Sequence, residues 1–231
     1  MSKSVVKDTT EMIPVHLGFI ADGNRRWAKE RGMPTLEGHK VGFETIKTVL
    51  KACIKRGVKY VSFYTFSTEN WSRTEEEVSY LMGLVKMNMK KLAKELKENG
   101  IRLMILGSRE RLDSEIVNFL DEAEEMTKDG KAGTVCICFN YGGKQEIVDA
   151  VKKIEGEITE EAIDANLYHP EVPPVDMVVR TSGEERISGF MLWRAAYSEM
   201  MFMERYWPDM DELAVDEVVA EYISRNRRFG K

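Results

Sequence analysis

Short apolar runs that alternate with amphipathic helical segments constrain the fold of this chain more than any other feature. The apolar runs cover residues 15–21, 58–66, 101–107, 134–140 and 175–180. Helical periodicity fills most of the intervals, over residues 37–55, 75–99, 109–128, 145–154 and 215–223, and a further helix starts near Arg26. Strands that alternate with helices predict an α/β fold with a central, mostly parallel β-sheet flanked by helices.

The size of the chain favours a single domain. A chain of 231 residues is long for one small domain and short for two, and 43% hydrophobic residues suffice for a sizeable core. We therefore expect one domain over residues 1–231, with residues 1–13 as a flexible N-terminal segment.

Charge and hydropathy argue against nucleic-acid binding, a signal peptide and a membrane-spanning segment. The net charge of −5 gives no support to nucleic-acid binding. Residues 1–11 lack the apolar core of a signal peptide, and no stretch approaches the ~20 apolar residues of a membrane span. We expect a cytoplasmic protein, and peripheral contact with a membrane stays open.

One segment after the first apolar run, residues 22–27 (Asp-Gly-Asn-Arg-Arg-Trp), predicts a site for a phosphate-bearing substrate. It joins a buried strand directly to a helix, and the bare N–H groups at a helix N-terminus attract anions. Arg25 and Arg26 add positive charge, and the Asp22 carboxylate is a hard oxygen ligand suited to Mg²⁺. A structural alternative is a capped helix start with surface arginines.

Three further polar clusters follow apolar runs, at residues 67–73, 140–143 and 180–188. Because ligands bind beyond the carboxyl ends of parallel strands, we expect these clusters and Asp22 to converge on one edge of the sheet. Structural alternatives are a polar turn that caps the next helix at Thr74 and an ion-pair loop formed with Glu184 and Glu185. The helix 75–99, rich in Leu and Met, either simply packs on the sheet or forms one wall of an apolar groove.

Taken together, these segments resemble the cis-prenyltransferase family, over a match that runs from His16 to Gly230. The motifs that carry the resemblance are HLGFIADGNRRWA, EGHKVG, FYTFSTENWSR, FNYGGK, RTSGEERIS, LWRAAYSE and WPD. The resemblance implies a homodimer with an apolar tunnel between the sheet and the helices 37–55 and 75–99. It also implies a Mg²⁺-dependent enzyme that condenses isopentenyl diphosphate with an allylic diphosphate, farnesyl diphosphate or a longer primer, and releases pyrophosphate.

The resemblance further assigns roles to individual residues. Asp22 corresponds to the Mg²⁺ ligand, and Glu199 resembles a second metal-associated acid. The positions that bind the allylic diphosphate are Gly23, Asn24, Arg25, Arg26, Trp27 and His39. Further substrate contacts correspond to Ser67, Thr68, Glu69, Trp71 and Arg73, and isopentenyl diphosphate binding to Arg180, Arg186, Ile187 and Ser188. Asn70 matches the position assigned to proton removal. An amide is a poor base, so we expect Asn70 to orient the base instead.

Two departures from the family pattern bear on the substrate. Thr35 stands where many relatives carry an arginine that contacts the allylic diphosphate, and Glu185 where some relatives carry histidine or glutamine. Thr65 lies at a position near the tunnel where side-chain size affects product length in the family. These features leave product length and primer open. Alternatives are a short-chain or irregular prenyl diphosphate synthase of the same fold and a non-catalytic partner subunit. The tail segment 228–230 resembles one that reaches the partner subunit's site.

Overall fold

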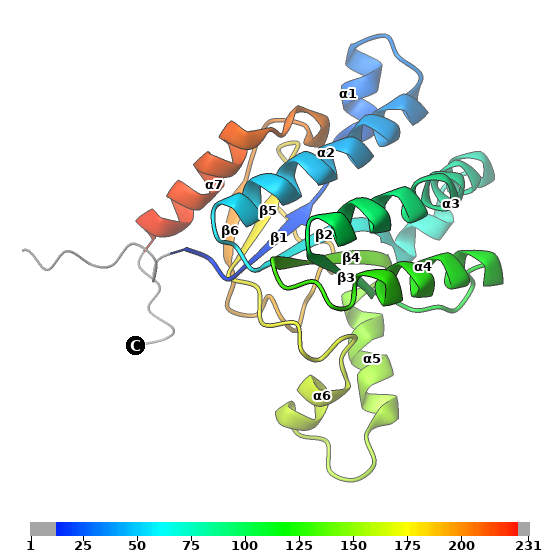
Figure 1. Ribbon diagram of the computed structural model, residues 1–231, viewed down its shortest axis with the longest axis vertical. Coiled ribbons are helices and arrows are strands. Elements are labelled where there is room, and N and C mark those ends of the chain that lie inside the picture. The colour runs from blue at the N-terminus through cyan, green and yellow to red at the C-terminus, as the bar shows by residue number, and fades with distance from the viewer. Residues whose placement is uncertain (1–12, 226–231) are drawn as a thin grey trace, which may run out of the picture.

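A computed structural model describes residues 13–225, which form a six-stranded parallel sheet with helices on both faces (Figure 1). The strands lie in the order β3-β4-β2-β1-β5-β6, and every neighbouring pair is parallel. Their bounds are β1 His16–Ile20, β2 Tyr60–Ser67, β3 Ile101–Leu106, β4 Gly133–Tyr141, β5 Met177–Arg180 and β6 Glu199–Phe202. The predicted α/β fold is confirmed.

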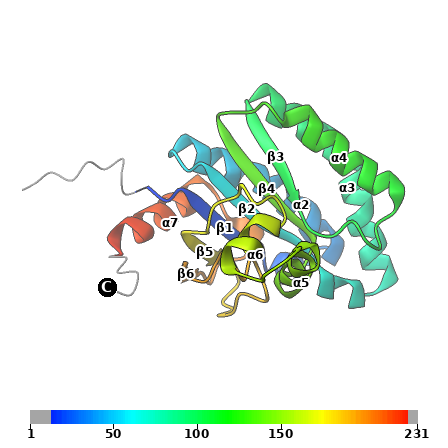
Figure 2. The ribbon, with the colours of Figure 1, turned by 90° about the horizontal axis from the view of Figure 1, so that it is seen from below.

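The helices divide between the two faces of the sheet. They are α1 Asn24–Glu30, α2 Thr35–Lys55, α3 Glu75–Glu98, α4 Ser114–Thr127, α5 Gly143–Lys153, α6 Glu160–Asn166 and α7 Glu212–Ser224, with short 3₁₀ turns at Thr68–Ser72 and Trp207–Asp209. Helices α2, α3, α4 and α7 cover one face, whereas α5 and α6 lie on the opposite side (Figures 1 and 2).

Because parallel strands of a covered sheet are buried on both faces, they carry continuous apolar runs. Phe19 and Phe63 point to the face under α2 and α7, where both rings pack against the fully buried Trp207. On the other face, Tyr64 stacks on Phe190 with ring centroids 5.1 Å apart. These packed rings fix the sheet beneath the strand ends where the polar clusters lie.

The five apolar runs become β1 to β5, and the helices predicted at 37–55 and 75–99 become α2 and α3. The prediction for 109–128 begins too early, because α4 starts at Ser114. The preceding loop is held by the Asn140 amide, which donates to the carbonyl oxygens of Ser108 and Glu110. Strand β6 and helix α6, of four and seven residues, were not predicted.

Within the described part of the chain, no helix is both long and apolar enough to cross a bilayer. The segment 228–230 lies outside the described residues.

Candidate active site

Asp22 lies just beyond the carboxyl end of β1, where the backbone is held against the end of β5. Its N–H and carbonyl oxygen both contact the Thr181 hydroxyl, at 3.1 and 2.7 Å. Gly23 then turns the chain into α1 with φ of 100°, and a Cβ there would lie 2.5 Å from the Tyr206 ring. Only glycine meets both requirements, and the turn presents the Asp22 carboxylate at the sheet edge.

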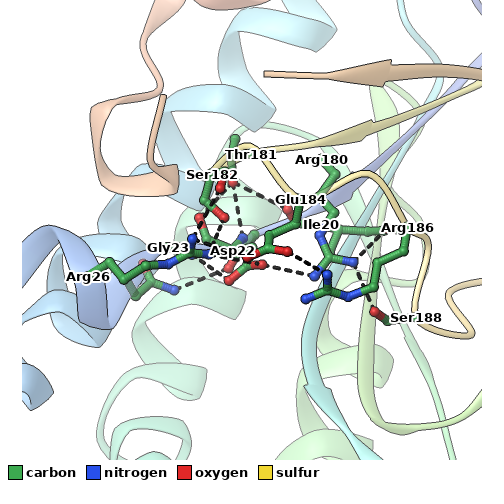
Figure 3. A network of polar contacts seen from close by, with 12 residues as sticks. Ile20, Asp22, Gly23, Arg26, Arg180, Thr181, Ser182, Glu184, Arg186 and Ser188 are labelled. Carbon is green, nitrogen blue, oxygen red and sulfur yellow. Dashed lines mark hydrogen bonds and ion pairs between the residues drawn. The ribbon is translucent and has the colours of Figure 1, made fainter. Parts of the chain in front are cut away.

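The Asp22 carboxylate contacts two guanidinium groups (Figure 3). Oδ2 accepts a hydrogen bond from Arg180 at 2.9 Å and lies 3.5 Å from Arg26, while Oδ1 accepts from the Gly23 N–H at 2.7 Å. Burial alone would raise the pKa of Asp22. The hydrogen bond and charge of Arg180, the Gly23 N–H and the charge of Arg26 outweigh burial and hold this pKa below its ordinary value. Asp22 is therefore ionised at neutral pH.

Arg180 connects Asp22 with the loop that follows β5. This arginine is 5% exposed, and one of its terminal nitrogens donates to the Ser188 hydroxyl at 2.9 Å and to the Arg186 carbonyl oxygen at 2.5 Å. Its Nε is buried and has no hydrogen-bond partner within the described residues. The guanidinium thus faces Ser188 on one side and Asp22 on the other.

The loop 181–188 also folds back onto α1. Arg26 donates to the Ser182 hydroxyl at 2.6 Å and to Glu184 at 3.2 Å, and Glu184 also pairs with Arg186. Ser182 and Glu184 are not among the predicted site residues, although the ion-pair alternative for this loop includes Glu184. Glu184 therefore holds two arginines of separate segments, Arg26 and Arg186, at one edge of the sheet.

A buried acid in the first turn of α3 contacts three more basic side chains. Glu77, with a side chain 9% exposed, accepts from Arg73 at 2.7 Å and lies 3.3 Å from His39 Nε2 and 3.5 Å from Arg25. Burial lowers the pKa of His39, and the Glu77 charge opposes this effect. Glu77 was also missed. Its sequence signals are the i, i+4 spacing from Arg73 and the place three residues after the helix cap Thr74.

The segment after β2 forms a compact turn around its own polar groups. Asn70 accepts from the Ser67 N–H at 3.0 Å, and Ser67 and Asn70 cap each other reciprocally. The Trp71 indole donates to Asn140 at 2.8 Å and has the Arg111 guanidinium 4.7 Å from its ring centroid. As predicted, the ends of β2 and β4 lie together, and Thr74 accepts from the Glu77 N–H as the cap of α3.

Two predicted site residues lie apart from this cluster. The Trp27 indole donates to Asp209 at 2.6 Å and has Arg31 over its ring at 4.5 Å. Glu199 begins β6 level with Met177, at the opposite end of the sheet from Asp22, and pairs with Arg225 at 2.9 Å. The structure therefore does not bring Glu199 to Asp22 within one chain.

Two adjoining cavities open at the Asp22 edge. A polar cavity of about 460 Å³ is lined by residues that include Asp22, Arg25, Arg26, Thr35 and His39. An apolar cavity of about 100 Å³ lies between the sheet, α2 and α3, and its walls include Phe43, Ile46, Thr65, Leu84, Val85, Met89 and Leu92. Ala21, Asn24 and His39 line both cavities, so a ligand with a charged head and an apolar tail fits the pair.

The donor set of this edge fits a hydrated divalent cation better than a closed metal cage. No group of three or more His, Cys, Asp or Glu side chains among residues 13–225 is arranged to hold a metal ion. Asp22 offers one ionised carboxylate beside groups that bind anions. Mg²⁺ typically uses one or two carboxylates, keeps several waters and takes its other ligands from substrate phosphates.

Comparison with known proteins places these features in a family. The sequence profile of the family described as "Putative undecaprenyl diphosphate synthase" matches residues 20–230. An isoprenyl transferase of Neisseria gonorrhoeae is 45% identical over 223 residues, covering 95% of this chain and 90% of that protein. A decaprenyl diphosphate synthase of Mycobacterium leprae is 43% identical over 228 residues, covering 94% of this chain and 77% of that protein.

Two solved structures share the fold along most of the chain. The lavandulyl diphosphate synthase of Lavandula x intermedia, in complex with dimethylallyl diphosphate, has a TM-score of 0.90 and 28% identity, covering 96% of this chain and 100% of that one. A "probable undecaprenyl diphosphate synthase" of Campylobacter jejuni has a TM-score of 0.82 and 28% identity, covering 94% and 99%.

Proposed function

Because the chain belongs to the cis-prenyltransferase family, we propose that it extends a cis-prenyl chain by condensing isopentenyl diphosphate with an allylic diphosphate. The primer is farnesyl diphosphate or a longer allylic diphosphate, and the products are a Z-polyprenyl diphosphate and pyrophosphate. A carbon–carbon bond forms at the allylic C1 as its bond to the diphosphate oxygen breaks, and a proton leaves the isopentenyl unit.

One observation supports this assignment above the others. The Asp22 carboxylate lies between Arg26, which extends from α1, and Arg180, which faces Ser188. Two diphosphates bound on these two sides would have Asp22 between them. Such an arrangement orients the nucleophilic alkene against the carbon that becomes cationic.

We assign the allylic diphosphate to the polar cavity at α1 and α2. The backbone of residues 23–26, the arginines 25 and 26, and His39 bind and orient it beside Asp22. As the allylic bond to oxygen breaks, negative charge develops on the leaving pyrophosphate, and fixed positive groups stabilise that charge. Mg²⁺, held by Asp22 and diphosphate oxygens, would supply further Lewis-acid stabilisation.

We assign isopentenyl diphosphate to the loop after β5. Arg180 and Arg186 offer two guanidinium forks, and Ser188 offers a hydroxyl, for charge-assisted hydrogen bonds to the diphosphate. Asn70 lies in the neighbouring turn, where it orients the group that accepts the proton, while residues 67–69, 71 and 73 complete the contacts with the two substrates.

The growing prenyl chain would enter the apolar cavity between α2 and α3, where each buried CH₂ contributes about 0.8 kcal/mol. Thr65 lines this cavity, and its hydroxyl donates to the Cys138 carbonyl oxygen at 3.0 Å. A long product would need α2 and α3 to separate further than they do here, so product length depends on how far this space extends.

A second candidate is a short-chain or irregular prenyl diphosphate synthase. The small apolar cavity and the similarity to the lavandulyl diphosphate synthase favour it. Identity favours the chain-elongating enzyme, at 43% with the decaprenyl diphosphate synthase against 28% with the lavandulyl diphosphate synthase. Retention of Asp22, Arg180 and Ser188 argues against a non-catalytic partner subunit.

Several properties of the whole protein belong to the same proposal. We infer that residues 1–231 act as one domain in a homodimer, located in the cytoplasm with peripheral membrane contact for product release. The metal proposal rests on Asp22. A metal role for Glu199 remains a prediction, which a Glu199→Gln variant tests by its Mg²⁺ requirement.

Product analysis tests the proposed function. The protein is incubated with radiolabelled isopentenyl diphosphate, Mg²⁺ and, in separate reactions, dimethylallyl, geranyl, farnesyl or a longer allylic diphosphate. A ladder of cis-containing products that grows from farnesyl diphosphate supports chain elongation. A single condensation with dimethylallyl diphosphate would favour the second candidate, and no incorporation with any primer would contradict both.

A further inference from the structure

The polar cavity at Asp22 contains one basic side chain without a counter-ion. Five basic residues line it: Arg25, Arg26, Lys29, His39 and Arg73. Four of them pair with carboxylates, three with Glu77 and Arg26 with Asp22 and Glu184. Lys29, in the last turn of α1, makes no side-chain hydrogen bond or ion pair with any residue between 13 and 225.

Lys29 shares the cavity wall with Thr35, the first residue of α2. Thr35 is exposed and uncharged. Arg26 and Lys29 are three residues apart on α1, so their side chains lie on the same side of that helix. The cavity wall therefore combines an uncharged residue at position 35 with an unpaired cation at position 29.

On the basis of the proposed function, we propose that Lys29 binds the allylic diphosphate and supplies the positive charge that Thr35 lacks. The other basic groups must exchange a carboxylate for the ligand, whereas the Lys29 ammonium loses only water. A flexible ammonium on a four-carbon stem can adjust to the terminal phosphate, which is farthest from the reacting carbon. The effect should fall on binding of the allylic substrate rather than on the chemical step.

A structural role for Lys29 is the competing explanation, because a lysine in the last turn of a helix stabilises the helix dipole. That role predicts lower thermal stability for a Lys29→Met variant and no change in substrate binding. The structural role therefore predicts a change in thermal stability, whereas the proposed role predicts a change in substrate binding.

Steady-state kinetics on four variants test the proposal. Lys29→Met should raise KM for farnesyl diphosphate by on the order of tenfold, with kcat and KM for isopentenyl diphosphate within about twofold of wild type. Lys29→Arg should retain most of the affinity. The double variant Lys29→Met/Thr35→Arg should recover it, because the new guanidinium replaces the lost ammonium. Lys40→Met, which removes an exposed charge from α2 outside the cavity, is the matched control.

Calorimetric binding of inorganic pyrophosphate gives a second readout that does not depend on turnover. Pyrophosphate affinity should fall in Lys29→Met and remain unchanged in Lys40→Met. Equal KM and equal pyrophosphate affinity in wild type and Lys29→Met would overturn the proposal, as would an equal loss in Lys29→Met and Lys40→Met. A wild-type protein that binds pyrophosphate through Lys29 but condenses no primer would contradict the proposed function alone.

Discussion

Replacing the buried acid Glu77 by glutamine should destabilise the protein by an amount that follows from its contacts. The hydrogen bond from Arg73 at 2.7 Å joins two charged groups and contributes about 1.5–3 kcal/mol. Arg25 at 3.5 Å is 59% exposed, so solvent limits its contribution to less than about 1 kcal/mol. Because glutamine keeps the shape and one acceptor, we expect a loss of about 2 kcal/mol, or roughly 4–8 °C in Tm.

The same reasoning predicts how a ligand changes the loss of stability in the Glu77→Gln variant. Pyrophosphate can replace Glu77 as the counter-ion of Arg25 and Arg73 and as the hydrogen-bond partner of His39, so it should raise the Tm of Glu77→Gln more than that of wild type. Differential scanning fluorimetry with and without pyrophosphate measures both effects, and Glu76→Gln, an exposed neighbour, is the matched control. An unchanged Tm in Glu77→Gln, or equal stabilisation of all three proteins by pyrophosphate, would refute the reasoning.

Two further predictions concern the core and the turn before α1. Burial lowers the pKa of His16 to about 4 in the folded protein, so between pH 7 and 5 the unfolded chain binds a proton that the folded protein does not, and the free energy of unfolding should fall by about 2 kcal/mol. Urea unfolding of a His16→Asn variant should show a smaller change in this free energy between pH 7 and 5, and a change equal to that of wild type would contradict the prediction. Gly23→Ala should lower kcat/KM at least tenfold, because its Cβ would lie 2.5 Å from Tyr206 and 2.9 Å from Ser182. Gly32→Ala, at φ of +64° with open space around it, shares the backbone strain and should retain activity; equal losses in both variants would point to strain alone.

Much of the fold was predictable because five strands are buried on both faces and carry continuous apolar runs. Strand β6 escaped prediction because it is a four-residue edge strand whose side chains are partly exposed. The early start predicted for α4 has a similar cause, since residues 109–112 have helical composition. Tertiary hydrogen bonds from Asn140 and a φ of 65° at Arg111 hold them in a loop.

The site was predictable where its residues directly follow strands. Asp22 closely follows β1 and Arg180 ends the neighbouring parallel strand β5, so topology alone places them at one edge. Glu77 was not predictable, because its contact with His39 joins residues 38 positions apart on two helices. Glu199 resembles a family acid in sequence, but it begins a strand, and the start of a parallel strand lies at the opposite edge.

The role of Asp22 between two diphosphate sites is tested most directly by incorporation of radiolabelled isopentenyl diphosphate in wild type and Asp22→Asn. Asparagine keeps the shape but removes the charge that faces Arg180 and Arg26. We predict Mg²⁺-dependent incorporation by wild type and a loss of at least a hundredfold in the variant, with circular dichroism unchanged. Incorporation by Asp22→Asn within a few-fold of wild type would contradict the account.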